Sequence, residues 1–122
     1  MNKGLTDKVE KPWGYELRWA INEKYLGKIL HISRGKRLSM QYHNVKDETV
    51  YVLNGLLLVD IGVGADGKPE STVVLKEGES MRIKPKTIHR FCAPSDGYVR
   101  IIEVSTPEID DVVRIQDDYG RS

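Results

Sequence analysis

Four polar side chains of kinds that bind divalent metal ions occur along the chain, and these are Gln41, His43, Glu48 and His89. Gln41 and His43 are two residues apart, so in a β-strand both side chains point to the same face. Glu48 follows after a short turn and can return from a second strand, which begins near Thr49. Two imidazoles, a carboxylate and an amide oxygen that converge on one point make a metal site of mixed nitrogen and oxygen character. The sequence therefore predicts a divalent-metal site made of these four residues.

The spacing of these residues distinguishes a metal site from a set of unrelated polar side chains. A single histidine in a strand is more often a hydrogen-bonded surface or core residue than a metal ligand. Here the first three candidates lie between two turn glycines, Gly35 and Gly55, in the pattern G-x5-Q-x-H-x4-E-x6-G. The chain contains only three histidines, and two of them belong to the set. Their joint occurrence favours the metal site.

Short strands separated by turn-forming residues predict the architecture that positions these side chains. The strand-like segments are residues 28–33, 49–53, 56–61, 71–75, 80–83 and 98–104. Asn54-Gly55 predicts a hairpin, and residues 62–69 predict a glycine-rich loop. No segment has a long helical period, although residues 108–113 are compatible with one helical turn. Many short strands at turn-punctuated spacing indicate an all-β antiparallel sandwich or barrel.

Length and composition limit the classes of protein to which the chain can belong. Its 122 residues fit one domain, with residues 1–10 expected to form a flexible N-terminal tail. A formal net charge of +1, with basic residues scattered among acids, argues against a nucleic-acid partner. Cys92 is the only cysteine, which excludes an intrachain disulfide and a cysteine-rich zinc site and favours a reducing cytoplasm. Residues 1–11 lack the apolar stretch of a signal peptide, and the longest apolar run, residues 56–59, is too short to cross a bilayer.

Longer matches along the chain point to a family. Residues 35–55 resemble the first motif of the cupin superfamily, with Gln41 in place of the usual first histidine, and residues 78–89 have the length of the second motif. More narrowly, the chain resembles the C-terminal isomerase domain of type II phosphomannose isomerases, which is normally fused to a mannose-1-phosphate guanylyltransferase. The matching segments are K-P-W-G-Y-E at 11–16, R-L-S-M-Q-Y-H at 37–43, I-E-V at 102–104, D-V-V-R at 111–114 and Y-G-R at 119–121.

This resemblance implies a fold, a cofactor and an activity. The fold would be a single cupin barrel, that is, a jelly roll or double-stranded β-helix. The metal would be zinc, although ligands of this type also accept manganese, iron, cobalt or nickel. The activity would be that of an aldose–ketose isomerase acting on a sugar phosphate of the mannose-6-phosphate/fructose-6-phosphate type or on another activated sugar. The resemblance also implies a homodimer, and we expect the domain to act as a stand-alone chain.

Two segments depart from the family pattern. In the second motif, Lys86 stands where the family has glycine, and Pro85 is shifted by one place. Residues 105–109 form a shorter segment than the corresponding loop of the family, and they would lie near the mouth of the barrel. The identity of the sugar therefore stays open.

Three ionisable residues are candidates for proton transfer and phosphate binding, namely Lys28, Glu103 and Arg114. An aldose–ketose isomerase moves a proton between neighbouring carbons, which requires a base beside an ion that offsets the developing negative charge. Glu103 stands in an apolar strand, where it is that base, or faces solvent, or forms an ion pair with Lys28 or an arginine. Lys28 alternates with apolar residues, and its match to a family lysine favours a pocket over a strand edge.

The remaining charged candidates have less specific signals. Arg114 could bind phosphate through its planar guanidinium group, or it could pair with Asp111 or Asp117. Three other cations near the last histidine are interpreted as surface charges, namely Lys84, Lys86 and Arg90. His31 differs in strand parity from Lys28, so we interpret it as a structural residue and not as a ligand.

Two other functions stay open beside the isomerase. One is a different metallocupin enzyme such as an iron dioxygenase, which metal content and oxygen consumption would distinguish. The other is a non-catalytic sugar-binding cupin, which would bind sugars without isomerising them.

Overall fold

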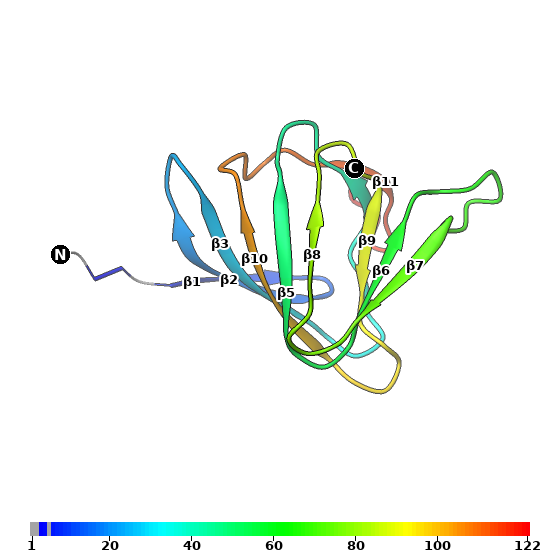
Figure 1. The fold of residues 1–122 in the computed structure, drawn as a ribbon, viewed down its shortest axis with the longest axis horizontal. Helices are drawn as coiled ribbons and strands as arrows, with labels where there is room; N and C mark the ends of the chain where they lie inside the picture. The colour runs from blue at the N-terminus through cyan, green and yellow to red at the C-terminus, as the bar shows by residue number, and fades with distance from the viewer. Residues whose placement is uncertain (1–2, 5) are drawn as a thin grey trace.

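The computed structural model describes residues 3–4 and 6–122, and within them the chain forms eleven β-strands (Figure 1). They are β1 (Asp7–Lys11), β2 (Gly14–Ile21), β3 (Leu26–Ile32), β4 (Met40–Tyr42), β5 (Glu48–Asn54), β6 (Leu57–Ile61), β7 (Ser71–Leu75), β8 (Ser80–Ile83), β9 (His89–Cys92), β10 (Val99–Ser105) and β11 (Val113–Gln116). Each pair of neighbouring strands is antiparallel. The described part of the chain contains no helix, so the all-β prediction is confirmed.

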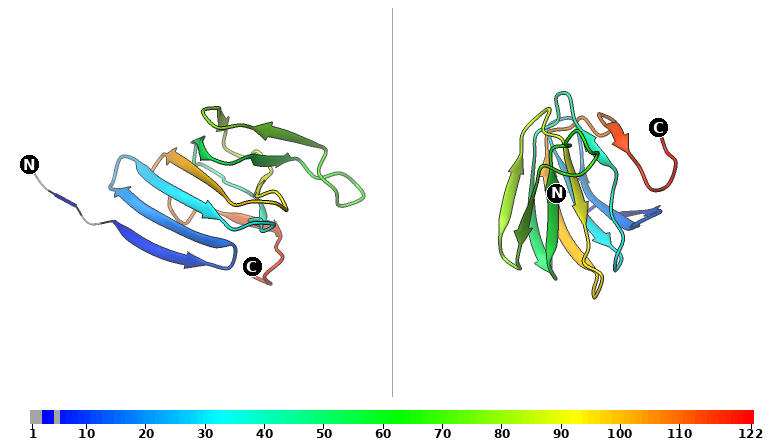
Figure 2. Two further views of the ribbon diagram at one scale, coloured as in Figure 1. Left: turned by 90° about the horizontal axis from the view of Figure 1, so that it is seen from below. Right: turned by 90° about the vertical axis from the view of Figure 1, so that its right-hand side faces the viewer.

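The strands form two sheets that face each other as a sandwich (Figures 1 and 2). One sheet has the order β1-β2-β3-β10-β5-β8, and the other has the order β11-β4-β9-β6-β7. Residues 108–113, considered for one helical turn, contain a hydrogen-bonded turn in which the amide of Asp111 donates to the carbonyl of Glu108 at 3.3 Å, and β11 begins at Val113. The described residues include no helix that could cross a membrane.

The turn at Asn54-Gly55 corrects the expected hairpin. β5 belongs to the six-stranded sheet and β6 to the five-stranded sheet, so this turn carries the chain from one sheet to the other. Gly55 has a φ of 86°, and a Cβ atom there would lie 2.6 Å from the carbonyl oxygen of Tyr98. Only glycine fits this close approach, at the point where the chain passes from one sheet to the other. The hairpin that does form joins β6 to β7 through the loop at residues 62–69, which was expected as a loop.

Part of the segment expected as an N-terminal tail forms a strand. Of the tail expected at residues 1–10, positions 1, 2 and 5 lie outside the described residues, whereas Asp7 to Glu10 pair with β2 as part of β1. At the corner between β1 and β2, Gly14 has a φ of 150°, and a Cβ there would lie 1.9 Å from the carbonyl oxygen of His31. The amide of Ser33 also donates a hydrogen bond to the carbonyl of Trp13, 2.9 Å away. These contacts explain why this corner needs glycine beside a buried tryptophan.

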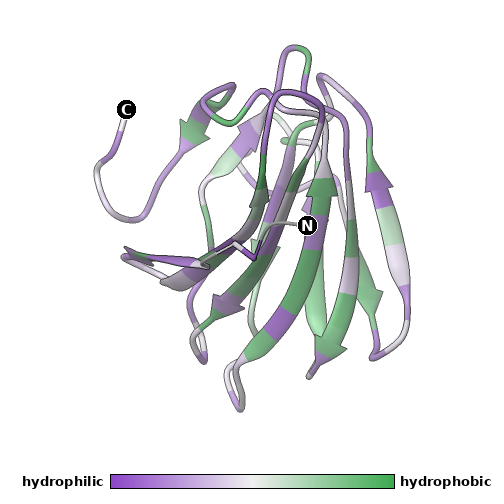
Figure 3. Cartoon of the chain, turned by 90° about the vertical axis from the view of Figure 1, so that its left-hand side faces the viewer, coloured by the Kyte–Doolittle hydropathy of each residue, from purple (hydrophilic) through white to green (hydrophobic). Residues whose placement is uncertain are grey.

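The inward faces of the long strands are apolar at one end and polar at the other. The apolar residues of these faces include Leu30, Ile32, Val50, Val52, Phe91, Val99 and Ile101, all of them buried. The polar residues that complete the same faces, also buried, are Lys28 on β3, Glu48 on β5, His89 on β9 and Glu103 on β10. The strands are largely hydrophobic in Figure 3, and the connecting segments are more hydrophilic. Because burying one apolar side chain contributes roughly 1.5–3 kcal/mol, the apolar end stabilises the fold, and the polar end is available for a site.

Candidate metal centre and adjoining cavity

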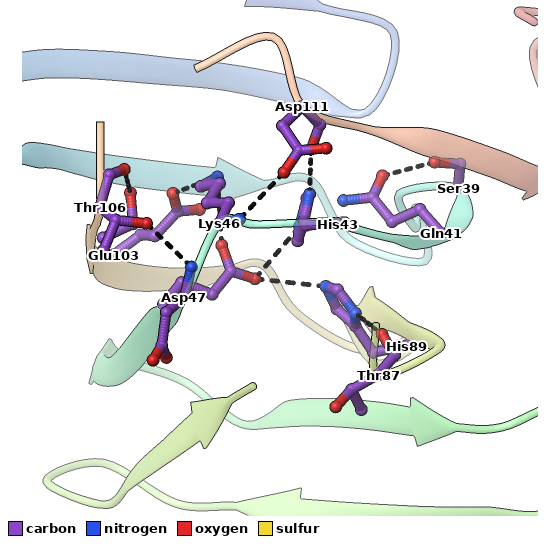
Figure 4. Close-up of polar contacts among 12 residues, drawn as sticks. Ser39, Gln41, His43, Lys46, Asp47, Thr87, His89, Glu103, Thr106 and Asp111 are labelled. Carbon is purple, nitrogen blue, oxygen red and sulfur yellow. Dashed lines mark hydrogen bonds and ion pairs between the residues drawn. The ribbon is translucent and has the colours of Figure 1, made fainter. Parts of the chain in front are cut away.

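Three buried side chains, those of His43, Glu48 and His89, converge at the polar end of the core, and Figure 4 labels two of them, His43 and His89. His43 follows β4 directly, Glu48 begins β5 and His89 begins β9. One nitrogen or oxygen atom from each residue lies within 4.8 Å of the others. Oε1 of Glu48 is 3.2 Å from Nε2 of His89 and 3.6 Å from Nε2 of His43. The structure thus brings together three of the four side chains that were singled out in the sequence as metal ligands.

Backbone carbonyl groups fix the orientation of both imidazole rings. Nδ1 of His43 donates to the carbonyl oxygen of Asp111 at 2.5 Å, and Nδ1 of His89 donates to that of Thr87 at 2.9 Å. A carbonyl oxygen only accepts hydrogen bonds, so each Nδ1 carries a proton. In the neutral ring, Nε2 then has a free lone pair directed toward Glu48. Such outer contacts are the usual means by which a protein orients histidine ligands.

The atoms that face one another in this cluster lack other partners. Nε2 of His43, Oε1 of Glu48 and Nε2 of His89 are buried and have no aligned hydrogen-bond partner among the described residues. Buried polar atoms are normally satisfied, so three such atoms in one place need an explanation. A divalent cation accepts two imidazole nitrogens and a carboxylate oxygen together. The residues present therefore fit a metal ion.

Gln41 lies next to this cluster but is turned differently. It pairs in register with His89 across β4 and β9, and it lines the same cavity as His43. Its Oε1 accepts a hydrogen bond from Oγ of Ser39 at 2.6 Å, so its amide nitrogen faces His43 (Figure 4). To act as the fourth ligand, Gln41 would have to rotate its amide group and direct the oxygen inward.

A buried lysine that sequence reasoning did not single out connects the cluster to Glu103. Nζ of Lys46 lies 3.2 Å from Oε2 of Glu48 and 2.9 Å from Oε2 of Glu103, and its side chain is only 6% exposed. The sequence offered one indication of its role, because Lys46 lies between two of the candidate metal ligands, His43 and Glu48. The lysine offsets the negative charge of two carboxylates that the fold removes from water.

The charges in this cluster shift the pKa values of its members. Burial alone would lower the pKa of Lys46, but Glu103 and Glu48 raise it well above its ordinary value. Burial would raise the pKa of Glu48, yet His43, His89 and Lys46 hold it well below its ordinary value. The pKa of Glu103 is raised, first by burial and then by the charge of Glu48, against the opposing effect of Lys46. One lysine shared by two carboxylates therefore leaves Glu103 as the carboxyl group that takes up a proton more readily.

A single aspartate holds the turn between His43 and Glu48. The carboxylate of Asp111 accepts hydrogen bonds from the amides of Asn44, Val45 and Lys46 at 3.0, 2.7 and 2.9 Å. These amides, that of Lys46 foremost, lower the pKa of Asp111 to about 2. The segment after β10 therefore crosses the same end of the sandwich as this turn (Figure 1) and positions His43 through both its backbone and its side chain.

A cavity of about 280 Å³ opens beside the cluster. Gln41, His43 and Lys46 lie at its wall together with Lys28 and Glu103. Lys28 and Glu103 face each other in register on β3 and β10, and both are at most 6% exposed. Neither is a surface residue, and they do not pair with each other: Lys28 lies 3.7 Å from Glu16, and the partner of Glu103 is Lys46.

Arg114 also lines the cavity, from β11 at its rim. Its Nη1 donates to the backbone carbonyl oxygen of Ser122 at 3.0 Å, and its buried Nε has no partner within the described part of the chain. Neither of the acids considered as partners pairs with it, because Asp111 binds backbone amides and Asp117 forms two hydrogen bonds with the guanidinium of Arg121.

Arg90 is a correction to the expected surface charges. It is only 3% exposed, and its Nη2 donates to the backbone carbonyl of Gln116 at 3.0 Å. Because it directly follows His89 on β9, its side chain points to the opposite face of the strand, under the C-terminal segment. Lys84 and Lys86 are exposed, as expected.

His31 lies away from the cluster, as its strand parity indicated. Its ring stacks between Tyr15 and Tyr98, with centroid distances of 4.7 and 4.8 Å. Its Nδ1 accepts a hydrogen bond from Nε of Arg100 at 3.1 Å. The third histidine of the chain is therefore part of an aromatic stack between neighbouring strands.

The two-sheet fold, with its histidines and glutamate at one end, is that of a cupin. A cupin-2 domain from Rhodospirillum rubrum superimposes with a TM-score of 0.74 at 13% identity, over 89% of this chain and 74% of that one. The capsular polysaccharide assembling protein CapF of Staphylococcus aureus gives 0.73 at 12% identity, over 93% of this chain and 35% of that one. Likenesses at these identities establish the fold.

The family follows from sequence comparison. The family model described as mannose-6-phosphate isomerase C-terminal matches residues 2–117, and the chain belongs to this family. It is 30% identical over 118 residues to the xanthan biosynthesis protein XanB of Xanthomonas campestris, covering 94% of this chain and 24% of XanB. It is 34% identical over 116 residues to the mannose-1-phosphate guanylyltransferase ManC of Salmonella typhimurium, covering 93% of this chain and 23% of ManC. The chain thus spans about a quarter of the length of these relatives.

Proposed function

We propose that this domain is a metal-dependent sugar-phosphate isomerase of the mannose-6-phosphate/fructose-6-phosphate type, or a close relative that acts on another activated sugar. The observation that carries the proposal is the set of unpartnered ligand atoms on His43, Glu48 and His89, beside a cavity that also holds a buried acid. Membership of the mannose-6-phosphate isomerase C-terminal family supports the same class of substrate.

The metal in this proposal is zinc, held by His43, Glu48 and His89, with Gln41 as a fourth ligand after rotation of its amide. Manganese, iron, cobalt or nickel would also suit this donor set. When bound, a divalent ion polarises substrate oxygens and offsets negative charge that develops during proton transfer.

Within the cavity, Glu103 is suited to move the proton. An aldose–ketose interconversion requires a group that takes a proton from one carbon and returns one to its neighbour. The pKa of Glu103 is raised by burial and by Glu48, which brings the carboxyl group closer to the range in which it can both accept and donate. Lys46 holds this carboxylate at 2.9 Å, and Lys28 stands across from it on β3. The two lysines would position the acid and donate hydrogen bonds to sugar oxygens.

Solvent-exchange measurements test the proposal directly. Metal-loaded protein incubated with mannose 6-phosphate in deuterated water should produce fructose 6-phosphate that carries deuterium at C1, the carbon that receives a proton, and the reverse step should introduce deuterium at C2 of the recovered mannose 6-phosphate. Glu103→Gln and Lys28→Met remove charge while keeping approximate shape, so each should lower turnover by at least about tenfold while metal content stays near that of the parent.

Other outcomes would replace the proposal. Full metal loading without exchange or isomerisation, across a panel of sugar phosphates, would contradict an isomerase. Retained sugar binding in that experiment would favour a non-catalytic sugar-binding cupin. Oxygen consumption with a bound redox metal would favour a dioxygenase.

Two further properties belong to the same proposal. A homodimer is supported by exposed apolar side chains on the six-stranded sheet, among them Trp19, Tyr51 and Val104, which are 47%, 42% and 47% exposed. Light scattering on the purified chain tests this association, because a monomer at all concentrations would exclude it. A cytoplasmic location is supported only by the use of a single cysteine.

A further inference from the structure

The cavity beside the candidate metal centre has an excess of positive charge. Six lysine and arginine side chains line it, against three carboxylates. Four of these cations have carboxylate partners: Lys28 and Arg18 contact Glu16, Lys46 contacts Glu48 and Glu103, and Arg121 contacts Asp117. For the other two, Lys11 and Arg114, no Asp or Glu oxygen of the described chain lies within 4.0 Å, although Nη1 of Arg114 donates to the main-chain oxygen of Ser122, the last residue described.

Lys11 is surrounded by other cations. It ends β1, opposite Gly14, and its side chain is partly buried at the cavity wall. Burial lowers the pKa of Lys11, and the positive charges of Arg18, Lys28 and Arg121 lower it further, with only Glu16 acting against them. A lysine ordered in such surroundings would be stabilised by an anion that enters the cavity.

Arg114 approaches the same cavity from the C-terminal segment. Its Nε is buried without a partner, and within the described chain its guanidinium donates a hydrogen bond only from Nη1, to Ser122, so most of its planar donor group is available. The turn after β1 and the C-terminal segment lie near each other in both views of Figure 2, and Arg121 of that segment lines the cavity as well. The two cations without an Asp or Glu partner therefore approach one cavity from opposite ends of the sequence.

We propose that Lys11 and Arg114 form an anion-binding end of the cavity, which holds the phosphate of a phosphorylated monosaccharide while the sugar ring extends toward His43. The choice of a sugar as the remainder of the ligand rests on the proposed function, but the anion site itself does not. Arg114 offers the planar donors that suit phosphate oxygens, and Lys11 adds a point charge. At about 280 Å³, the cavity is at the lower limit for small-molecule sites, which favours a monosaccharide phosphate over a nucleotide sugar.

Binding measurements on matched lysine variants test this proposal. Lys11→Gln removes the proposed contact, whereas Lys8→Gln removes a lysine of the same strand that stands over the ring of Tyr15 and pairs with Glu10. Calorimetry with mannose 6-phosphate, mannose and inorganic phosphate should show that Lys11→Gln weakens both phosphate-containing ligands by about tenfold or more, since a hydrogen bond to a charged group is lost. Lys8→Gln should bind all three ligands with the affinity of the parent. The affinity for mannose, which has no phosphate, should be the same in the parent and both variants.

Nuclear magnetic resonance locates the site independently of catalysis. Addition of inorganic phosphate to the parent should shift the backbone amides around Lys11 and Arg114, and the same shifts should be reduced in Lys11→Gln. Equal affinities of Lys11→Gln and Lys8→Gln for mannose 6-phosphate would overturn the proposal, even if the protein isomerises this sugar. Phosphate binding that depends on Lys11, in a protein without isomerase activity, would uphold the anion site and contradict the proposed function instead.

Discussion

Polar residues at the ends of otherwise apolar strand faces form the candidate site of this protein. Lys46 shows how closely their charges are coupled, because it contacts two buried carboxylates, Glu48 of the candidate metal centre and Glu103 of the cavity wall. Burying three ionised groups is favourable only when each has a partner. Replacing any one of them should therefore affect the stability of the fold as well as the site.

Replacement of Lys46 by methionine tests this coupling. Lys46→Met leaves Glu48 and Glu103 buried without their shared cation, so we expect the free energy of unfolding to fall by about 3 kcal/mol. Denaturant unfolding should be measured with a chelator present, so that a metal ion does not take the place of the lysine. Lys84→Met, at an exposed position, is the control and should stay within about 0.5 kcal/mol of the parent. A Lys46→Met protein as stable as the parent would show that the carboxylates do not depend on this ion pair.

Lys86 has the left-handed backbone conformation that glycine adopts most readily. Its φ is 68°, the one positive value at a non-glycine position in the described chain, and its amide donates to the carbonyl of His43 at 2.6 Å. This is the position at which the sequence departs from the second cupin motif. The left-handed conformation costs a non-glycine residue about 1–2 kcal/mol, so the hydrogen bond and the surrounding turn must hold Lys86 there.

The strain at Lys86 predicts an unusual gain in stability. Lys86→Gly should raise the free energy of unfolding by up to about 1 kcal/mol, because relief of the strain exceeds the added entropy of the unfolded chain. Lys84→Gly, two residues earlier and without a positive φ, should lower it by about 0.5–1 kcal/mol. Denaturant unfolding of both variants gives the comparison, and a loss of stability in both would indicate that Lys86 is not strained.

Residue types and spacing, together with the resemblance to the two cupin motifs, singled out His43, Glu48 and His89, and the structure brings these three side chains together. Lys46 could not be predicted as a site residue, because a lysine in a turn is usually exposed. Only the arrangement of β5 and β10 shows that it is buried. The same reason explains Arg90, whose burial depends on the C-terminal segment that covers it.

At the scale of elements, the connecting segments matter as much as the strands. The turn between β4 and β5 carries Lys46, and the segment between β10 and β11 fixes that turn through Asp111. The C-terminal segment carries Arg114 and Arg121, and it is fastened by Arg37, which forms two hydrogen bonds with Asp118 at 2.7 and 2.9 Å. Side chains at the cavity rim therefore depend on contacts made outside it.

Loss of the Arg37–Asp118 pair should loosen the C-terminal segment. In Asp118→Asn, the amide of Arg121, which is bound to Asp117 in the parent, should exchange with solvent deuterium a few times faster, since an exposed pair is worth at most about 1 kcal/mol. Asp47→Asn breaks a similar exposed pair with Arg82 elsewhere and should leave this exchange rate unchanged.

The effect of Asp118 should depend on pH. The hydrogen bond from Arg37 holds the pKa of Asp118 below its ordinary value of 3.8. Because the pKa of Asp118 is lower in the folded than in the unfolded chain, the Arg37–Asp118 pair contributes its full stability above the ordinary pKa. That stability is lost as the pH falls through the folded pKa of Asp118. The difference in exchange between the parent and Asp118→Asn should therefore shrink in this acid range. A constant difference down to the lowest pH would contradict the pair as its cause.

Local pattern predicted the segments that form β3, β5, β6, β7, β8 and β10, but it did not predict β1, β2, β9 or β11, nor which strands pair. The segments expected at 71–75 and 80–83 coincide with β7 and β8. Asn54-Gly55 was a correct turn signal, yet it joins two sheets instead of two paired strands, because the partners of β5 are β10 and β8. Such pairings depend on residues far apart in the sequence, which a local dipeptide does not encode.

The whole molecule is a sandwich with one apolar end and one charged end. Its family membership and cupin fold agree with the resemblance found in the sequence. The sandwich form explains why residues that are as far apart in the sequence as His43 and His89 meet, since β4 and β9 are neighbours in the five-stranded sheet. It also explains why a small cavity with a net positive charge adjoins them.

Metal content is the most direct test of the central claim that His43, Glu48 and His89 hold a metal ion. Chelator-treated protein that is titrated with zinc should bind one ion per chain, and the variant that combines His43→Ala with His89→Ala should bind none under the same conditions. Gln41→Ala should lose less affinity, because it removes at most one neutral oxygen ligand. His31→Ala is the matched control, since the third histidine lies in an aromatic stack away from the cluster, and it should keep full occupancy. Full occupancy in the protein that lacks both His43 and His89, or no zinc bound by the parent, would contradict the claim.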